Sequence, residues 1–232
     1  GIEDGHSMSL SSELGALQWI ALRTRPDLAW SVSRVPRAPK DEEETATAWV
    51  RVRHILQDLY KTWSYKLVFR PNNEEERLQM KIHADASLAP TGGKSHEGSC
   101  VFHGQNLISW RSSRQHLTSL STCESELVAL SSGVTYGIPL LLTMRELQAA
   151  AVSLEASTDN TAALQHVKLG AESPYRTRHI SMRGVHLHDH VEHGLLSCSY
   201  VPTTINAADA MTKGLSTLIL RRLLPLLCLH VG

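Results

Sequence analysis

The sequence has no excess of charge of either sign. Its 232 residues include 23 lysines and arginines and 23 aspartates and glutamates, so the formal net charge is zero. This balance argues against a histone-like or strongly basic nucleic-acid binder, and any hold on a polyanion must come from a local patch. The chain also contains 13 histidines, which could make such a patch depend on pH.

Closely spaced cysteines are also absent. The four cysteines are scattered, without the C-x-x-C spacing of a zinc ribbon or a redox pair. We therefore expect buried free thiols in a reducing compartment. These residues are Cys100, Cys123, Cys198 and Cys228.

The C-terminal segment, residues 215–231, lacks an uninterrupted apolar run. Arg221, Arg222 and Pro225 interrupt it, and it is short for a membrane span. We expect a packing helix there and no membrane partner. No signal peptide opens the chain, and Gly1 in place of a methionine indicates a fragment of a longer protein.

Three helices are predicted in the first 71 residues. The first covers residues 11–23 with Ser11 or Ser12 as its cap, and the second begins at Pro26, which suits a first helical position. The third begins with acids at 42–44, where negative charge favours the helix dipole. We expect a small helical subdomain over residues 1–71.

A polar stretch over residues 72–77 predicts a linker, and a second domain is expected over residues 78–232. Its patterns predict an α/β fold with a mixed five-stranded sheet flanked by helices. Strands are predicted over 78–86, 98–104, 106–113, 151–158 and 195–201, and helices over 121–147, 160–168, 176–193 and 206–213, followed by the terminal helix.

Four acids occupy positions that a metal site could use. Asp85 and Asp159 end predicted strands, whereas Glu126 and Asp209 lie in the first turns of predicted helices. An isolated aspartate on a strand is ordinarily a solvated edge residue. In an α/β sheet, however, strand ends and helix starts face a shared crevice. Hard divalent cations prefer such oxygen ligands. We therefore hypothesise that these four acids bind a pair of ions.

These acids and their surroundings resemble the ribonuclease H domain of copia-type LTR retrotransposon polyproteins. The resemblance runs from about residue 80 to 215 and includes ISWRS at 108–112 and ADAMTK at 208–213. Upstream, LGAL at 14–17, TRPDLA at 24–29 and VSR at 32–34 resemble the end of the preceding reverse transcriptase. The helical subdomain is then a remnant of the polymerase thumb or connection region.

The resemblance implies a ribonuclease H-like fold and hydrolysis of the RNA strand of RNA/DNA hybrids. It implies two Mg²⁺ ions, for which Mn²⁺ could substitute, with Asp85 as the bridge. Asp209 would bind the ion that activates water, and Glu126 and Asp159 the ion that faces the leaving oxygen. The implied partners are the hybrid and an upstream polymerase domain, and the implied location is a cytoplasmic virus-like particle if the element is active.

Two departures limit what the resemblance implies. The short segment 200–206 before the last acid contains no histidine, so histidine-assisted product release is in doubt. The sequence also contains no Asp-Asp pair of the polymerase type, so we do not expect DNA synthesis.

The long predicted helix offers two glutamates as the second acid. Its apolar stripe includes Leu127, Leu130 and Val134. Glu126 is next to this stripe, and Glu124 projects about 200° away at 3.6 residues per turn. We therefore expect Glu126 to point inward, and we expect Pro139 to kink or divide the helix.

Basic residues and histidines offer further hypotheses. A nucleic-acid contact is predicted for Arg111, Arg114, Arg176 and Arg178, and the alternative is an ordinary solvated surface. His186, His190 and His193 could hold zinc on one helix face, but a solvated face is favoured. For the whole chain, the alternatives are a non-catalytic connection-type domain that supports hybrid binding and a transposase-like or resolvase-like DNA nuclease.

Overall fold

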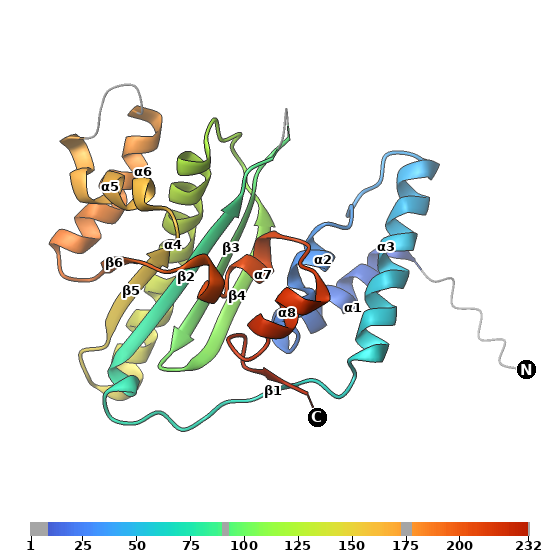
Figure 1. Cartoon of the computed structure of the whole chain (residues 1–232), viewed down its shortest axis with the longest axis horizontal. Helices are drawn as coiled ribbons and strands as arrows, with labels where there is room; N and C mark the ends of the chain where they lie inside the picture. Colours follow the sequence, from blue (N-terminus) through green and yellow to red (C-terminus); the bar gives the residue numbers. More distant parts are fainter. Residues whose placement is uncertain (1–8, 90–92, 173–177, 232) are drawn as a thin grey trace, which may run out of the picture.

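The computed structural model describes residues 9–89, 93–172 and 178–231 (Figure 1). Its N-terminal part contains the three predicted helices, namely α1 (Leu10–Arg23), α2 (Ala29–Ser33) and α3 (Glu42–Lys61). The cap of α1 is Ser9, which accepts from Ser12 N at 3.2 Å, rather than Ser11 or Ser12. Asp41 caps α3 by accepting from Glu44 N at 2.7 Å.

The predicted mixed sheet of five strands is confirmed, with the order β4-β3-β2-β5-β6. In this sheet β3 pairs antiparallel with both β2 and β4, whereas β5 pairs parallel to both β2 and β6. The parallel pairs require helical connections that cross over the sheet. The strands are β2 (Gln79–Ser87), β3 (His96–His103), β4 (Asn106–Arg114), β5 (Ser153–Thr158) and β6 (Ser197–Tyr200).

Helix α4 (Thr122–Gln148) covers one face of the sheet (Figure 1). Two glycines allow its close approach to β2, because side chains at Gly133 and Gly137 would crowd Ile82. Of the two predicted effects of Pro139, a division of the helix is wrong, since α4 continues through this residue, and a kink stays a prediction. A proline removes only one helical hydrogen bond, and the packing of Gly137 and Leu141 on either side keeps α4 on the sheet.

By length and composition α4 could also cross a membrane, and it is the one such helix among the described residues. Half of its most apolar window is buried, and core helices pass the same test. Helices α5 (Thr161–Leu169) and α6 (Arg178–Glu192) pack beside it.

Helices α7 (Asp209–Thr212) and α8 (Thr217–Leu223) cover part of the opposite face of the sheet (Figure 1). The packing helix expected within residues 215–231 is present as α8 but is shorter than that segment. Helix α8 ends before Pro225, which cannot continue a helix, and the chain then forms β7 (Leu229–His230). Strand β7 pairs antiparallel with β1 (Lys66–Leu67), so the C-terminal end of the described chain meets the segment that follows α3.

The N-terminal helices contact the sheet directly. Trp110 Nε1 on β4 donates to the carbonyl oxygen of Ala21 at 2.7 Å. Ser33 Oγ hydrogen-bonds with His96 Nε2 and Ser112 Oγ, each at 3.1 Å. The division into residues 1–71, 72–77 and 78–232 stays a prediction.

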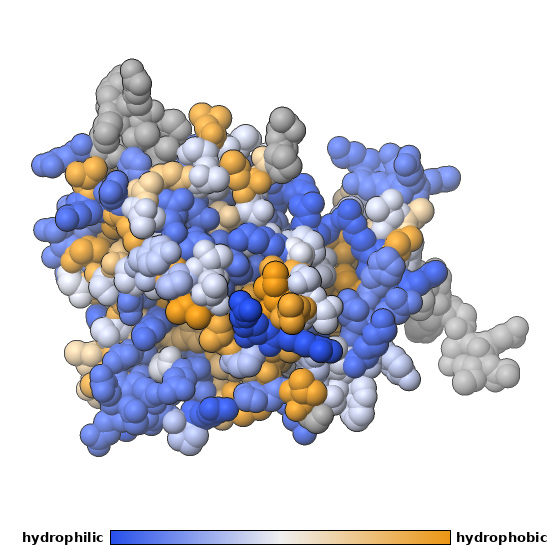
Figure 2. All heavy atoms as spheres, viewed as in Figure 1, coloured by the Kyte–Doolittle hydropathy of each residue, from blue (hydrophilic) through white to orange (hydrophobic). Residues whose placement is uncertain are grey.

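The surface in Figure 2 is hydrophilic over much of the visible face, with hydrophobic atoms gathered around the position of α8. Leu218 on that helix is 77% exposed.

The four cysteines are free, and two of them, Cys100 and Cys228, are buried. This confirms the expectation of free thiols, although the other two, Cys123 and Cys198, are only half-buried.

Candidate metal centre

Asp85 lies near the end of the central strand β2 and is 1% exposed. Its partner on β3 is Gly98, which in turn pairs with Ser112 on β4. A side chain at Gly98 would overlap the Cβ atom of Met211. This glycine therefore allows α7, which begins with Asp209, to approach the sheet beside Asp85.

Two further acids reach Asp85 from separate elements. Glu126 is in the first turns of α4, and Asp159 follows the last residue of β5. One ligand oxygen from each of Asp85, Glu126 and Asp159 lies within 4.8 Å of the others. Thr158 Oγ1 donates to Glu126 at 3.3 Å, and Thr203 Oγ1 donates to Asp159 at 2.6 Å. The fold thus brings three of the four predicted acids together.

The fourth acid, Asp209, joins this group through a lysine. Its Oδ1 atom is 2.7 Å from Lys213 Nζ, which is also 3.4 Å from Oδ2 of Asp85. Thr212 Oγ1 donates to the same Asp85 oxygen. We assigned no role to Lys213 from the sequence. Its spacing of four residues from Asp209 was the available signal, because such residues face each other on a helix.

Burial and neighbouring carboxylates raise the pKa values of two of these acids, Asp85 and Glu126. Burial, followed by the charges of Asp85 and Asp159, raises the pKa of Glu126 to about 8. Burial also raises the pKa of Asp85 to about 6, although Lys213 and Thr212 oppose this effect. Burial lowers the pKa of Lys213, but the two aspartates outweigh it, so this pKa rises. The negative charge of these carboxylates exceeds the positive charge of Lys213 beside them. The cluster is therefore suited to bind a hard divalent cation.

We expect the metal-free protein to lose stability as the pH rises from about 4 to 8. The unfolded carboxyls titrate near 3.8 and 4.5, whereas in the folded protein the pKa of Asp85 is about 6 and that of Glu126 about 8. The folded state therefore binds more protons in this window, and its advantage disappears through pH 8. Thermal unfolding in EDTA should show a lower Tm at pH 8.5 than at pH 5.5, by a few degrees.

In Glu126→Gln this difference in Tm should shrink, since the replaced side chain cannot titrate. Addition of Mg²⁺ at pH 8.5 should raise the Tm of the natural protein, because ligand binding stabilises the folded state. An equal Tm at both pH values in EDTA would contradict the raised pKa values of Asp85 and Glu126.

Glu124 is buried too, which the helix stripe did not predict. Its carboxylate accepts from Leu120 N at 2.7 Å, and its own backbone N–H donates to Ser121 Oγ at 3.1 Å. These bonds satisfy backbone groups at the start of α4. Glu124 therefore has a capping position, and Glu126 is the glutamate in the acid group.

Two of the four predicted basic residues, Arg111 and Arg114, have described side chains. On β4, Arg111 pairs with Ser99 and precedes Ser112, which lies in the same row of paired residues as Gly98 and Asp85. Neighbouring residues on a strand point to opposite faces of the sheet, so the Arg111 side chain points to the α4 face. Its guanidinium lies 4.2 Å from the ring centre of Tyr136. Arg114 ends β4 and is exposed. Arg176 is outside the described residues, as is the side chain of Arg178 at the start of α6.

Among the described residues, His186, His190 and His193 do not form a three-ligand metal site. The rings of His186 and His190 meet edge to face with centres 4.7 Å apart, and His193 Nδ1 is 2.6 Å from the carbonyl oxygen of Asp189. Within the described part of the chain, three ligand atoms come close together at the Asp85, Glu126 and Asp159 group alone.

Comparison with known proteins places the chain among retrotransposon polyproteins. It is 30% identical over 207 residues to the retrovirus-related Pol polyprotein from transposon TNT 1-94 of Nicotiana tabacum, covering 88% of this chain and 15% of that protein. It is 30% identical over 163 residues to a truncated transposon Ty1-A Gag-Pol polyprotein of Saccharomyces cerevisiae, covering 69% and 14%. The chain thus spans about one seventh of these relatives. No family model matches the sequence.

Solved structures resemble this chain at low sequence identity. The foamy viral protease-reverse transcriptase dRH in complex with double-stranded DNA is 15% identical, with a TM-score of 0.50 over 84% of this chain and 32% of that chain. RNase H1 from Halobacterium salinarum is 14% identical, with a TM-score of 0.44 over 58% and 94%. The chain belongs to the retrotransposon Pol polyproteins, and its mixed five-stranded sheet with flanking helices is a ribonuclease H-like fold.

Proposed function

We propose that this chain hydrolyses the RNA strand of RNA/DNA hybrids in a reaction that depends on two metal ions. The observation that supports the proposal is the convergence of Asp85, Glu126 and Asp159 within 4.8 Å, with Asp209 linked to them through Lys213. The acids come from β2, α4, the end of β5 and α7, so only the folded chain assembles them. The copia-type origin suggested by the sequence motifs agrees with this assignment.

The four acids would hold Mg²⁺, with Mn²⁺ as a substitute, because their oxygens suit hard cations. When bound, two ions supply positive charge to the attacking and the departing oxygens of a phosphodiester. The protein contributes the orientation of the ligands. Thr212 and Thr203 hydrogen-bond Asp85 and Asp159, and Lys213 holds Asp209. Lys213 also places a positive charge where the phosphate backbone would meet the acids.

A cleavage assay with three substrates tests the proposal. With Mg²⁺ present, the RNA strand of an RNA/DNA hybrid should be cut to 5′-phosphate and 3′-hydroxyl ends, while duplex DNA and single-stranded RNA stay intact. Binding of the hybrid without cleavage would favour a non-catalytic connection-type domain. Cleavage of duplex DNA would favour a transposase-like or resolvase-like nuclease.

The proposed partners are the hybrid and an upstream polymerase domain of the same polyprotein. The chain matches only about one seventh of its relatives, so such a neighbour is expected within the polyprotein. In an active element we propose that both act inside a cytoplasmic virus-like particle.

Arg114 provides a test of how a neutral chain holds a polyanion. It is exposed at the end of β4, and Arg114→Gln should lower the slope of log affinity for hybrid against log salt by about one unit or slightly less. Arg77→Gln is a matched control, because Arg77 is also exposed but lies before β2, at the opposite end of that strand from Asp85. Arg176→Ala/Arg178→Ala extends the test to the start of α6. Unchanged slopes would make these arginines ordinary surface residues.

A further inference from the structure

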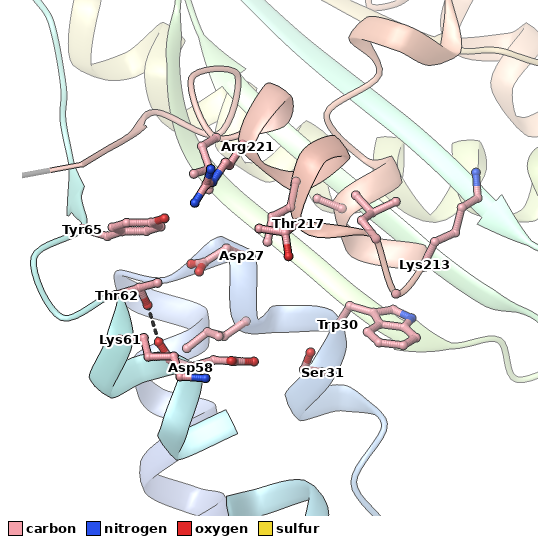
Figure 3. Close-up of a pocket in the computed structure, with 16 residues that line it drawn as sticks. Asp27, Trp30, Ser31, Asp58, Lys61, Thr62, Tyr65, Lys213, Thr217 and Arg221 are labelled. Carbon is pink, nitrogen blue, oxygen red and sulfur yellow. Dashed lines mark hydrogen bonds between the residues drawn. The ribbon is translucent and has the colours of Figure 1, made fainter. Parts of the chain in front are cut away.

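A cavity of about 490 Å³ lies between the N-terminal helices and the C-terminal helix α8 (Figure 3). Its walls come from the segment at residues 27–31, the end of α3, the turn that precedes β1, and residues 210–224. This volume is within the range of about 300–1,000 Å³ that is usual for sites of small ligands. None of the four acids lines the cavity, and the proposed function uses only one of its lining residues, Lys213.

Its lining combines aromatic rings with cations. Trp30 and Tyr65 are in the wall, and so are Lys61 and Arg221. Figure 3 shows Arg221 reaching from α8 toward Tyr65 and Asp27 across the cavity. In the described part of the chain neither Lys61 nor Arg221 has a salt-bridge partner within 4.0 Å.

One of the two acids in the lining, Asp27, is already neutralised. Asp27 forms a buried ion pair with Arg25, with 2.7 Å between Oδ2 and Nη2. Arg25 also donates to the carbonyl oxygen of Thr62 at 3.1 Å and lies 5.2 Å from the ring centre of Tyr65. The other acid in the lining, Asp58, is exposed and has no salt-bridge partner within 4.0 Å among the described residues. The lining therefore carries more available positive charge than negative charge.

The cavity adjoins the candidate metal centre through Lys213. This residue lines the cavity, while its Nζ atom lies 2.7 Å from Asp209 and 3.4 Å from Asp85. A nucleic-acid strand with one phosphate at the acids would therefore have a neighbouring nucleotide close to the cavity.

We propose that this cavity binds one unpaired nucleotide of a nucleic-acid strand, with its base against the aromatic wall and its phosphate toward Arg221 and Lys61. Stacking on aromatic rings tolerates every base, because each base has a π face, and cations beside such rings take the phosphate. The inference rests on the proposed function only for the source of the nucleotide, which would be a frayed or cleaved end of the strand at the acids.

Calorimetric titration of the full chain with AMP and with UMP tests the proposal. EDTA is included so that the acids cannot bind phosphate through a metal ion. Both nucleotides should bind, and inorganic phosphate should bind at least tenfold more weakly because it lacks a base. Arg221→Gln should weaken AMP binding roughly tenfold, as expected for a charge-assisted hydrogen bond. Arg222→Gln is the matched control, since Arg222 is equally exposed on α8 but does not line the cavity.

Tyr65→Leu, checked for an unchanged Tm, should weaken AMP and UMP alike and leave phosphate binding unchanged. Absence of AMP binding at millimolar concentration would overturn the proposal, and so would equal effects of Arg221→Gln and Arg222→Gln. Phosphate binding as tight as AMP binding would overturn the role of the aromatic wall. Asp85→Asn separates the two proposals: retained AMP binding with no hybrid cleavage supports both, whereas a natural chain that binds AMP but never cleaves refutes the proposed function alone.

Discussion

Asp85→Asn should reduce metal-dependent cleavage of a hybrid to the background of the assay. Asp85 connects the two parts of the site. It is grouped with Glu126 and Asp159, and its Oδ2 atom is also 3.4 Å from Nζ of Lys213, which pairs with Asp209. Asparagine has nearly the same shape but removes the negative charge and one ligand oxygen. Removal of a single charge-stabilising group from an active site commonly costs two to three orders of magnitude in rate, and a bridging ligand should cost more.

The measurement is single-turnover cleavage of a labelled hybrid in Mg²⁺ and in Mn²⁺. Asp189→Asn is a suitable control, since Asp189 is exposed on α6. Hybrid binding in EDTA should be retained by Asp85→Asn, which shows that the fold and the nucleic-acid surface remain. Full activity in this variant, or full activity of the natural chain in excess EDTA, would contradict the assignment of the metal centre.

Glu126→Gln and Glu124→Gln should differ by two orders of magnitude or more in the rate of hybrid cleavage. The two residues form a close comparison, because they are two positions apart on α4 and are 6% and 7% exposed. Glu126 belongs to the acid group, whereas the Glu124 carboxylate accepts from Leu120 N. Glutamine can still accept that hydrogen bond, so Glu124→Gln should cleave at nearly the natural rate.

The two variants should also differ in metal binding. Titration with Mn²⁺ should show weaker binding to Glu126→Gln and unchanged binding to Glu124→Gln. Glu124→Gln should instead lower the Tm slightly, since it removes a negative charge from the positive end of the helix dipole. If Glu124→Gln lost cleavage and Glu126→Gln kept it, the assignment of the second acid would be reversed.

Local patterns in the sequence determined much of the secondary structure. Helix α3 follows from acids at its start and a buried stripe of Ala48, Val52 and Ile55. The order of three strands, a long helix and then alternating strands and helices follows from hydrophobic periodicity and turn residues. These features depend on neighbours a few positions apart, so they are readable without the fold. The four acids could also be identified, but only through the resemblance of their surroundings to a family.

The tertiary structure decided how these parts meet. The bonds of Thr212 to Asp85 and of Asn206 to Ala84 join residues 127 and 122 positions apart. The role of Lys213 and the convergence of the acids depend on such contacts. The burial of Glu124 depends on the loop that precedes α4. The strand β7 replaced the last part of the expected terminal helix because β1, more than 160 residues away, offered it a partner. Local propensity carries no information about such distant partners, since packing supplies most of the free energy that selects among locally allowed conformations.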